Sequence, residues 1–352
     1  MHLVSCIEVF VFIMKRRITD IPIGDLEDVV TELGMKRFVA DQLVRWLYKQ
    51  RVQSFDEMTN IQAGGRETLA KEFDVGALEL AESLVDDDGT SKYCFSLHDG
   101  ERVETVLIPS GEDRCTLCVS TQVGCKLGCD FCRTGEAGFK RNLTQGEIIG
   151  QAIEVQRANE RSITNIVFMG MGEPMFNIDA VLSSIEILLD ERAFGISKRK
   201  ITLSTAGIVP ELEEFVKRSD VKIAISLNAV TDELRSKLMP INKRYAIAEI
   251  MDFCRKYSKK EKGRITFEYI MMDHVNDSLE DAAQLVKLLK GVRAKVNLIP
   301  FNAYPGSPYK PSPRERMEAW QDILTPKGIQ TNIRNSRGQN ILAACGQLAN
   351  KK

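Results

Sequence analysis

From Cys115 to the C-terminus, short apolar runs rich in β-branched residues alternate with stretches of helical periodicity. This alternation is typical of parallel strands joined by crossover helices. The predicted strands are Thr116–Ser120, Asn165–Met169, Lys200–Ser204, Lys222–Leu227, Ile265–Ile270 and Lys295–Pro300, with a weaker seventh at Gln330–Arg334. The predicted helices cover residues 144–159, 178–191, 210–218, 246–259, 278–290 and 314–324.

The pattern therefore predicts an α/β fold. Six or so strand–helix units are too few for a complete eight-unit barrel, so a partial (βα)6 barrel and an open sheet both remain compatible with it. In either arrangement the functional site is expected at the carboxyl ends of the strands.

The first 112 residues follow other patterns. Apolar residues recur at helical spacing from Gly24 to about Phe73, which predicts three helices, the last within residues 54–73. Tyr93, Phe95 and Leu97 alternate with polar residues before a turn and a second alternating run, which predicts a β-hairpin. We therefore expect a helical accessory domain (1–75), a β-hairpin connector (76–112) and a catalytic domain (113–352).

The amino terminus carries a short apolar stretch, Leu3 to Met14, which Glu8 interrupts. A membrane span needs about 20 apolar residues, and the basic residues of a secretory signal do not precede this stretch. Two interpretations stay open: translation starts at Met14, or the stretch is a short buried strand. Neither predicts a membrane association, and we expect a cytoplasmic protein.

The charges of the chain are balanced, with 48 Lys and Arg against 49 Asp and Glu. This balance argues against nonspecific coating of nucleic acid or acidic membrane. This balance is still compatible with RNA binding through a local basic surface.

Nine cysteines are present, and five of them fall between Cys115 and Cys132. An odd and clustered set favours a metal or redox site in a reducing compartment over a disulfide framework. Cys125, Cys129 and Cys132 form a C-x3-C-x2-C spacing, so three thiolates lie on one short loop. Thiolates are the usual ligands of iron–sulfur clusters. A structural zinc takes four ligands, and no second cysteine pair or nearby histidine completes such a set.

Polar residues follow several of the predicted strands. The segment Met169–Pro174 (MGMGEP) places glycines and Glu173 after one strand. Ser204 ends the next strand, Ser226-Leu227-Asn228 the following one, and Asn302 a later one. Because the carboxyl ends of parallel strands share one edge, these groups are expected to converge on a ligand.

The cysteine spacing, with an aromatic residue before the last cysteine, resembles the radical SAM superfamily. The segments Thr116–Asn142, Met169–Pro174, Asp273–Asn276, Asn297–Asn302 and Ala344–Leu348 look like the RlmN family within it. This resemblance implies methylation of C2 of adenosine in 23S rRNA at the peptidyl transferase centre and in tRNA 3′ to the anticodon. It also implies one [4Fe–4S] cluster, two S-adenosylmethionine molecules per turnover, an external electron donor and a thiol reductant. We expect a monomer whose helical domain contacts RNA.

The resemblance implies a role for each matching residue. Cys125, Cys129 and Cys132 would ligate the cluster. The S-adenosylmethionine site would comprise Gly172, Glu173, Ser204, Ser226, Leu227, Asn228 and Asn302. Asn228 departs from the family, where histidine is usual, which puts its cofactor contact in doubt.

Three further residues would act on the substrate. Cys345 would become S-methylcysteine and then carry the RNA through a methylene bridge. Glu104 would accept the C2 proton, and Cys118 would attack the Cys345 sulfur to release the product and leave a disulfide.

Three alternatives remain open at this point. A Cfr-type enzyme shares the cysteines and methylates C8 of the same rRNA adenosine. A zinc-stabilised RNA-binding protein would use the thiols structurally, and a radical SAM enzyme with a small-molecule substrate would not need the basic segments. The segments expected to contact RNA are Lys198–Lys200, Lys243-Arg244, Lys259–Arg264 and Arg334–Arg337, with Lys36, Arg37 and Arg45 in the helical domain.

Overall fold

A computed structural model describes residues 15–260 and 263–349 of the chain. The apolar stretch at the amino terminus, and with it the expected start at Met14, lies outside the described residues. Among the described residues, no helix is long and apolar enough to cross a membrane.

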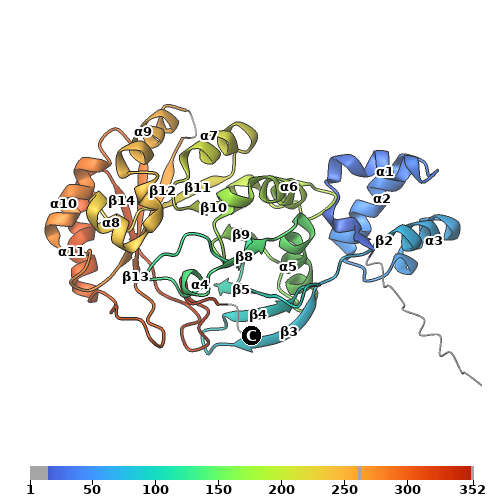
Figure 1. Cartoon of the computed structure of the whole chain (residues 1–352), viewed down its shortest axis with the longest axis horizontal. Coiled ribbons are helices and arrows are strands. Elements are labelled where there is room, and N and C mark those ends of the chain that lie inside the picture. The colour runs from blue at the N-terminus through green and yellow to red at the C-terminus, as the bar shows by residue number, and fades with distance from the viewer. Residues whose placement is uncertain (1–14, 261–262, 350–352) are drawn as a thin grey trace, which may run out of the picture.

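One ten-stranded sheet forms the centre of the molecule, in the order β14-β13-β12-β11-β10-β9-β6-β5-β4-β3. The seven strands from β6 to β14 in this sheet run parallel, which confirms all seven predicted strands. These parallel strands are β6 (Arg114–Cys118), β9 (Asn165–Phe168), β10 (Ile201–Thr205), β11 (Lys222–Ser226), β12 (Ile265–Met271), β13 (Ala294–Pro300) and β14 (Gln330–Ile333). The sheet curves into a partial barrel (Figure 1).

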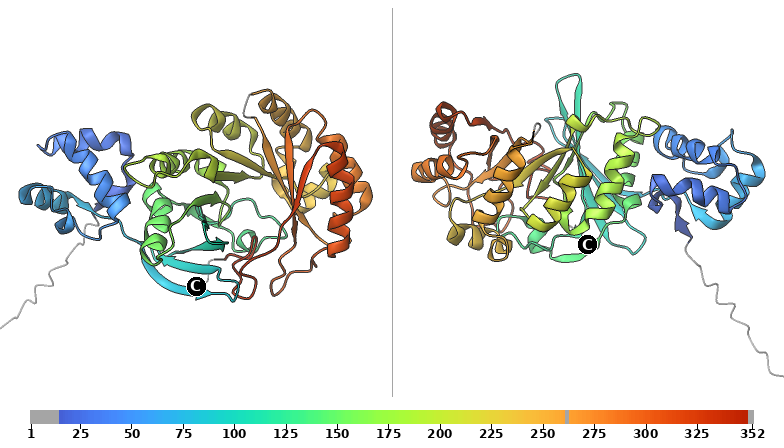
Figure 2. Two further views of the ribbon diagram at one scale, coloured as in Figure 1. Left: turned by 180° about the vertical axis from the view of Figure 1, so that it is seen from behind. Right: turned by 90° about the horizontal axis from the view of Figure 1, so that it is seen from above.

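The six predicted crossover helices are present and cover the outer face of this sheet (Figures 1 and 2). They are α5 (Gln145–Arg157), α6 (Ile178–Leu189), α7 (Val209–Arg218), α9 (Ile247–Ser258), α10 (Leu279–Leu288) and α11 (Arg314–Leu324). Their apolar stripes pack on the strands, and Trp320 of α11, for example, is fully buried against Tyr269 of β12. Two short helices, α4 (Arg133–Glu136) and α8 (Asp232–Leu238), were not predicted.

The predicted hairpin is also present, as β4 (Ser91–Ser96) and β5 (Arg102–Ser110). Its strands do more than connect two domains. β5 pairs antiparallel with β6, and β3 (Glu79–Val85) pairs with β4, so the hairpin extends the catalytic sheet. Groups on one face of the hairpin can therefore line the barrel.

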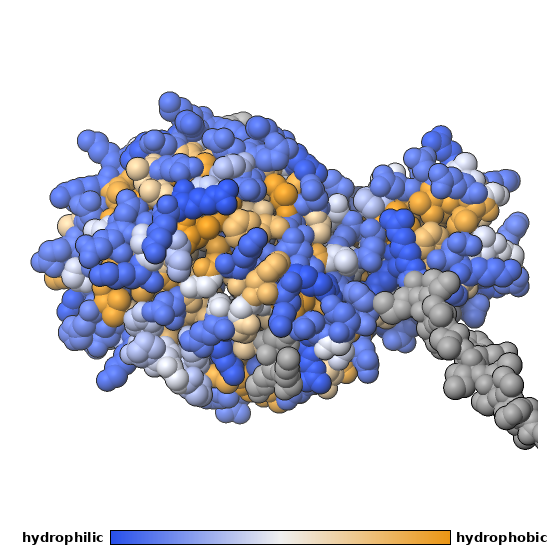
Figure 3. Space-filling view, viewed as in Figure 1, coloured by the Kyte–Doolittle hydropathy of each residue, from blue (hydrophilic) through white to orange (hydrophobic). Residues whose placement is uncertain are grey.

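The N-terminal helices form a separate lobe beside α5 and α6 (Figures 1 and 2). α1 (Leu26–Glu32) and α2 (Phe38–Val44) match the prediction, and α2 continues as one turn of π-helix. The third helix begins later than predicted, at Ala63 (α3, Ala63–Glu72), because Ser54 caps a separate short 3-10 turn. Figure 3 shows apolar surface on this lobe, and the Phe38 side chain there is 57% exposed.

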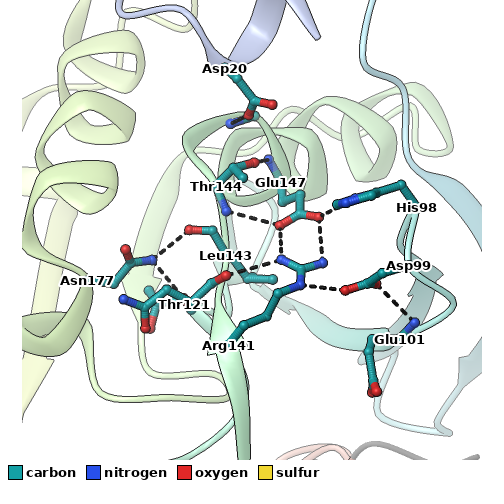
Figure 4. A network of polar contacts seen from close by, with 12 residues as sticks. Asp20, His98, Asp99, Glu101, Thr121, Arg141, Leu143, Thr144, Glu147 and Asn177 are labelled. Carbon is teal, nitrogen blue, oxygen red and sulfur yellow. Dashed lines mark hydrogen bonds and ion pairs between the residues drawn. The ribbon is translucent and has the colours of Figure 1, made fainter. Parts of the chain in front are cut away.

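A buried carboxylate joins this lobe, the hairpin and the barrel (Figure 4). Glu147, in the first turn of α5, is fully buried and accepts two hydrogen bonds from the Arg141 guanidinium, at 2.7 and 2.9 Å. His98 of the hairpin turn lies 3.3 Å away, and Arg17 of the N-terminal lobe 3.6 Å away. Burial acts to raise the pKa of Glu147, but the bonds from Arg141 and the Thr144 amide outweigh it, so the pKa is lowered.

Glu147→Gln should therefore destabilise the protein by about 2–3 kcal/mol at pH 7, since it removes the fully buried carboxylate from Arg141 and leaves only the partly exposed Asp99 to pair with it. A carboxyl group with a lowered pKa stabilises the fold above its unfolded pKa and loses that contribution as the pH falls. The difference between the wild type and the variant should therefore shrink below about pH 4.5. Urea unfolding at pH 7 and pH 4 measures both quantities. Glu214→Gln, which breaks an exposed pair with Lys217, should cost less than about 0.5 kcal/mol; equal losses in the two variants would contradict the argument.

Candidate functional site

The three cysteines of the predicted cluster lie on a loop that follows β7 (Gln122–Gly124) and ends at α4. A small hairpin of β7 and β8 (Phe139–Asn142) encloses this loop. Its turn is closed by a hydrogen bond of 3.0 Å from the Cys125 amide to the Gly138 carbonyl. Cys129 is buried, whereas Cys125 and Cys132 are partly exposed, so the loop presents its sulfurs toward the barrel opening.

The thiols of this loop affect one another electrostatically. The pKa of Cys125 is raised to about 12, chiefly by burial, and the charges of Cys132 and Glu173 contribute to this rise. Burial also raises the pKa of Cys129 well above its ordinary value, and the charges of Cys132 and Cys125 add to this effect. The structure thus brings the three thiols together, as predicted.

The donor set fits an iron–sulfur cluster. Three thiolates suit iron, and backbone amides of Leu127 and Gly172 donate to the Cys125 sulfur, as amides around such sulfurs commonly do. Within residues 15–260 and 263–349, no three His, Cys, Asp or Glu side chains converge as the ligands of a single metal ion do. The ligands of a cubane each bind a different iron and need not converge in that way.

The Met169–Pro174 loop lies against the cysteine loop. Gly172 has a φ of +102°, and a Cβ atom on it would lie 2.6 Å from the Gln122 side chain, so only glycine fits. The buried Glu173 carboxylate accepts hydrogen bonds from the amides of Met175 (3.1 Å) and Ala206 (2.8 Å). Burial raises the pKa of Glu173 to about 7, against the effect of these bonds. The Thr205 hydroxyl also donates to this carboxylate. One of its roughly four lone-pair sites then stays free, so Glu173 can still accept one hydrogen bond from an ammonium group.

Two of the predicted hydroxyls meet at the ends of neighbouring strands. Ser204 of β10 and Ser226 of β11 lie with their Oγ atoms 3.5 Å apart and remain partly exposed. Leu227 and Asn228 are buried. The Asn228 amide is used within the protein, because its Oδ1 accepts from the Ile270 amide and its Nδ2 donates to the Met239 sulfur. Asn228 therefore ties β11 to β12.

Glu104 and Cys118 share one face of the sheet. Val106 pairs with Cys118 across β5 and β6, and Glu104 lies two residues before Val106 on the same face. Glu104 is buried; its carboxylate lies 3.1 Å from the Lys92 ammonium and accepts a hydrogen bond of 2.9 Å from the Ala349 amide. Hence Glu104, predicted from a hairpin strand, lies inside the barrel near the end of the chain.

The segment after β14 crosses the barrel opening and is anchored on both sides. Asp88, in the turn between β3 and β4, accepts a hydrogen bond from the Gly338 amide. At the other side, Thr134 donates to the Leu348 carbonyl (2.6 Å), and the Arg133 amide donates to the Gly346 carbonyl (2.8 Å). These anchors hold the Cys345 loop over α4 and the cysteine loop.

Cys345 lies within this loop, near two other thiols. Asn302 holds it by donating a 3.0 Å hydrogen bond to the Cys345 carbonyl, so Asn302 positions the Cys345 loop. The Cys345 side chain is exposed to solvent. Nevertheless, the surrounding protein raises its pKa to about 12, and the charges of Cys118 and Cys132 contribute.

Cys118 is the buried partner of this pair. Burial raises its pKa to about 12, and both thiols are free. The structure therefore places Cys345 within electrostatic reach of both Cys118 and the cluster loop, although these residues are far apart in the sequence.

Several residues of this site were not found from the sequence. They are Lys92, which pairs with Glu104, the anchors Asp88 and Thr134, and Arg235, which is described below. Their side chains mostly bind backbone groups distant in the sequence, which leave no pattern in it. Lys92 alone carried a signal, as a charged residue within the apolar run of β4.

Two glycines of the cysteine loop provide a matched test of its geometry. Both have positive φ, but a Cβ atom on Gly124 would lie 1.8 Å from the Gly138 carbonyl oxygen, whereas Gly128 has open space. Gly128→Ala should cost about 1–2 kcal/mol for its left-handed backbone and leave the loop able to bind iron. Gly124→Ala should open the β7–β8 turn and lose most of the iron. Iron and sulfide content after anaerobic reconstitution measures the difference, and equal contents would refute this account of the loop.

The comparisons with known proteins agree with this geometry. The radical SAM superfamily model matches residues 119–286, and the model of the ribosomal RNA large subunit methyltransferase N-terminal domain matches residues 17–75. A radical SAM methyltransferase from Sphaerobacter thermophilus is 41% identical, with 94% of this chain and 98% of that chain covered and a TM-score of 0.89. SuiB of Streptococcus suis bound to S-adenosylmethionine is 17% identical over 64% of this chain and 51% of its own, with a TM-score of 0.46, and is too distant to carry an argument. The chain therefore belongs to the RlmN family of radical SAM methyltransferases, which work with a [4Fe–4S] cluster and S-adenosylmethionine.

Proposed function

We propose that this enzyme methylates C2 of adenosine in 23S rRNA, at the peptidyl transferase centre, and in tRNA, 3′ to the anticodon. The observation that carries the proposal is the meeting of two further thiols beside the cluster loop. The charges of both Cys118 and Cys132 raise the pKa of Cys345. Cys345 therefore lies near Cys118, which is not among the expected cluster ligands, and near Cys132, which is one of them. Simple methyl transfer to a nucleophile needs neither extra thiol, whereas a covalent route needs both.

Adenine C2 is electron-poor and bears no acidic hydrogen, so a radical must add to it. Cys125, Cys129 and Cys132 would hold the cluster, which when bound would supply the electron for reductive cleavage of S-adenosylmethionine. We assign Gly172, Glu173, Ser204 and Ser226 to the binding of S-adenosylmethionine, with Leu227 and Asn228 contributing backbone. Asn302 positions the Cys345 loop by donating a hydrogen bond to the Cys345 carbonyl.

The residues on the barrel face take the substrate steps. Cys345 accepts a methyl group from one S-adenosylmethionine, and a hydrogen atom is then removed from that methyl group. The remaining methylene joins the Cys345 sulfur to C2 of the adenine. The adduct would then return its unpaired electron to the cluster, and Glu104 accepts the C2 proton. The Cys118 thiolate attacks the Cys345 sulfur, a disulfide forms, and the electron pair leaves with the methylated base, which takes up a proton. An external electron donor and a thiol reductant restore the enzyme.

The basic segments expected to contact RNA lie at two opposite ends of the parallel strands. Lys243-Arg244 follows β11, and Arg334–Arg337 follows β14, so both lie toward the carboxyl ends of the strands where the site is. Lys198–Lys200 directly precedes β10, and the Lys259–Arg264 run, partly outside the described residues, precedes β12, so both lie at the opposite end. We propose that RNA meets the first two segments and the N-terminal lobe, with the target adenosine extruded from its stack. We place this reaction in the cytoplasm, with the enzyme acting as a monomer.

Nucleoside analysis tests the specificity directly. The reconstituted enzyme, incubated anaerobically with S-adenosylmethionine, a reductant and protein-free 23S rRNA, should produce 2-methyladenosine at one position. Mass spectrometry of the digested rRNA distinguishes this product from 8-methyladenosine, which a Cfr-type enzyme would give. tRNA in a parallel reaction should be methylated at the adenosine 3′ to the anticodon. Exclusive formation of the C8 product would overturn the proposal.

Variants of Cys345 and Cys118, the two thiols outside the cluster loop, should stop the reaction at different steps. Cys345→Ala removes the methyl carrier, so no covalent RNA–protein species can form. Cys118→Ala keeps the carrier but lacks the thiol that releases the product, so RNA should stay attached through a thioether that reducing agents do not break. Glu104→Gln should trap a similar species, because the C2 proton remains. Denaturing gels with and without ribonuclease show the adduct; absence of RNA from both cysteine variants would contradict the covalent route.

A further inference from the structure

Helix α8 lies between the cysteine loop and the strand ends that are expected to hold S-adenosylmethionine. Its last carbonyl, that of Leu238, accepts a hydrogen bond of 3.0 Å from the amide of Asp130, which lies between two of the cluster cysteines. Leu234 and Leu238 pack in the same apolar cluster as Cys129. The helix is thus fixed to the loop at one end.

Arg235, in the middle of α8, connects the helix to the strand ends. It is fully buried, and its Nε donates to the Leu227 carbonyl at 3.0 Å. Its Nη2 donates to the carbonyls of Ala206 (2.6 Å) and Ser226 (3.1 Å). These three carbonyls lie where β10 and β11 end, next to the paired hydroxyls of the candidate cofactor site. One guanidinium therefore joins both strand ends to the helix that holds the cysteine loop.

The acceptors of this guanidinium are all uncharged. The remaining two are the Asn242 amide oxygen, at 2.8 Å, and the Tyr245 carbonyl, at 3.4 Å. The nearby Asp232 carboxylate is bonded instead to Asn242 and to the Ile247 amide. Burial lowers the pKa of Arg235 to about 10, so it stays protonated at neutral pH. A buried charge without a bonded carboxylate is costly, which a purely structural role does not explain.

Arg235 has a neighbour in Cys129 that would become anionic as an iron ligand, since Leu234 and Leu238 of the same helix pack in one cluster with Cys129. Burial and the charges of Cys132 and Cys125 raise the pKa of Cys129, and Arg235 acts in the opposite direction. Three thiolates make the cluster site negative, and reduction of the cluster adds one more negative charge. A buried cation beside it stabilises the reduced form more than the oxidised form, since the protein interior screens charge weakly.

We propose that Arg235 is a positioning residue of the cofactor site, which holds the ends of β10 and β11 in place against the cysteine loop and favours the reduced state of the cluster. The proposal rests on the radical SAM assignment and is independent of which RNA carbon is methylated. Its test therefore uses no RNA, so that its failure and a failure of the C2 assignment can be told apart.

Three variants of the full-length enzyme separate charge from geometry. Arg235→Met removes the charge and the donors, whereas Arg235→Lys keeps the charge but cannot reach both strand ends with a planar fork. Arg218→Met is the control, because Arg218 is a partly exposed arginine on α7 that pairs with Asp179. The reduction potential of the reconstituted cluster, followed by electron paramagnetic resonance, reports on the charge. The dissociation constant of S-adenosylmethionine reports on the strand ends.

In Arg235→Met the ratio of reduced to oxidised cluster at a fixed potential should fall about tenfold, which is about 59 mV for one electron. Arg235→Lys should keep that ratio within about twofold of the wild type but bind S-adenosylmethionine about fivefold more weakly, and the control should change neither quantity. If Arg235→Met cannot hold the cluster but Arg235→Lys can, that result also supports the role of the charge. Wild-type potential in Arg235→Met, wild-type affinity in Arg235→Lys, or loss of the fold in both would overturn the proposal.

Discussion

The site depends on the register of the parallel sheet, because nearly every group in it lies at or beside the end of a strand. Pairing of β10 with β11 places Ser204 within 3.5 Å of Ser226. Pairing of β5 with β6 puts Glu104 and Cys118 on one face. A slip of one residue in either pairing would turn these side chains to the opposite face of the sheet. The buried helices on the outer face resist such a slip, so core packing fixes the chemistry indirectly.

The C-terminal segment adds Cys345, a thiol that neither the parallel strands nor the cysteine loop supplies. Cys345 is carried by a loop without regular structure, yet its neighbours are bound at Asp88, Thr134 and Glu104. These contacts span more than two hundred residues of sequence. Because Asp88 lies in the turn between β3 and β4 and Glu104 lies on β5, the strands that extend the parallel sheet also hold the segment around Cys345. Removal of any one of these three contacts should change the position of the Cys345 loop before it destabilises the hydrophobic core.

The strands and crossover helices could be predicted from the sequence, because each buries a periodic apolar face. The cluster loop could be predicted too, since its cysteine spacing carries the chemistry directly. Helix α8 was missed because its seven residues carry only a short apolar face, and the third N-terminal helix was predicted too long because Ser54 caps a separate turn. The contacts of Lys92 and Arg235 could not be predicted, since they are made mostly to backbone carbonyls and a carboxylate from distant segments.

The raised pKa values of Cys118 and Cys345 determine whether these two thiols can react at neutral pH. Disulfide formation and exchange proceed through the thiolate. With pKa values of about 12, Cys118 and Cys345 are both protonated at neutral pH in the protein alone. The charge of Cys118 raises the pKa of Cys345, so ionisation of one thiol opposes ionisation of the other. A positively charged ligand beside either thiol would lower the pKa of that thiol. Neither thiol is therefore a ready nucleophile by itself, and each needs a nearby cation or proton acceptor before it can react as a thiolate.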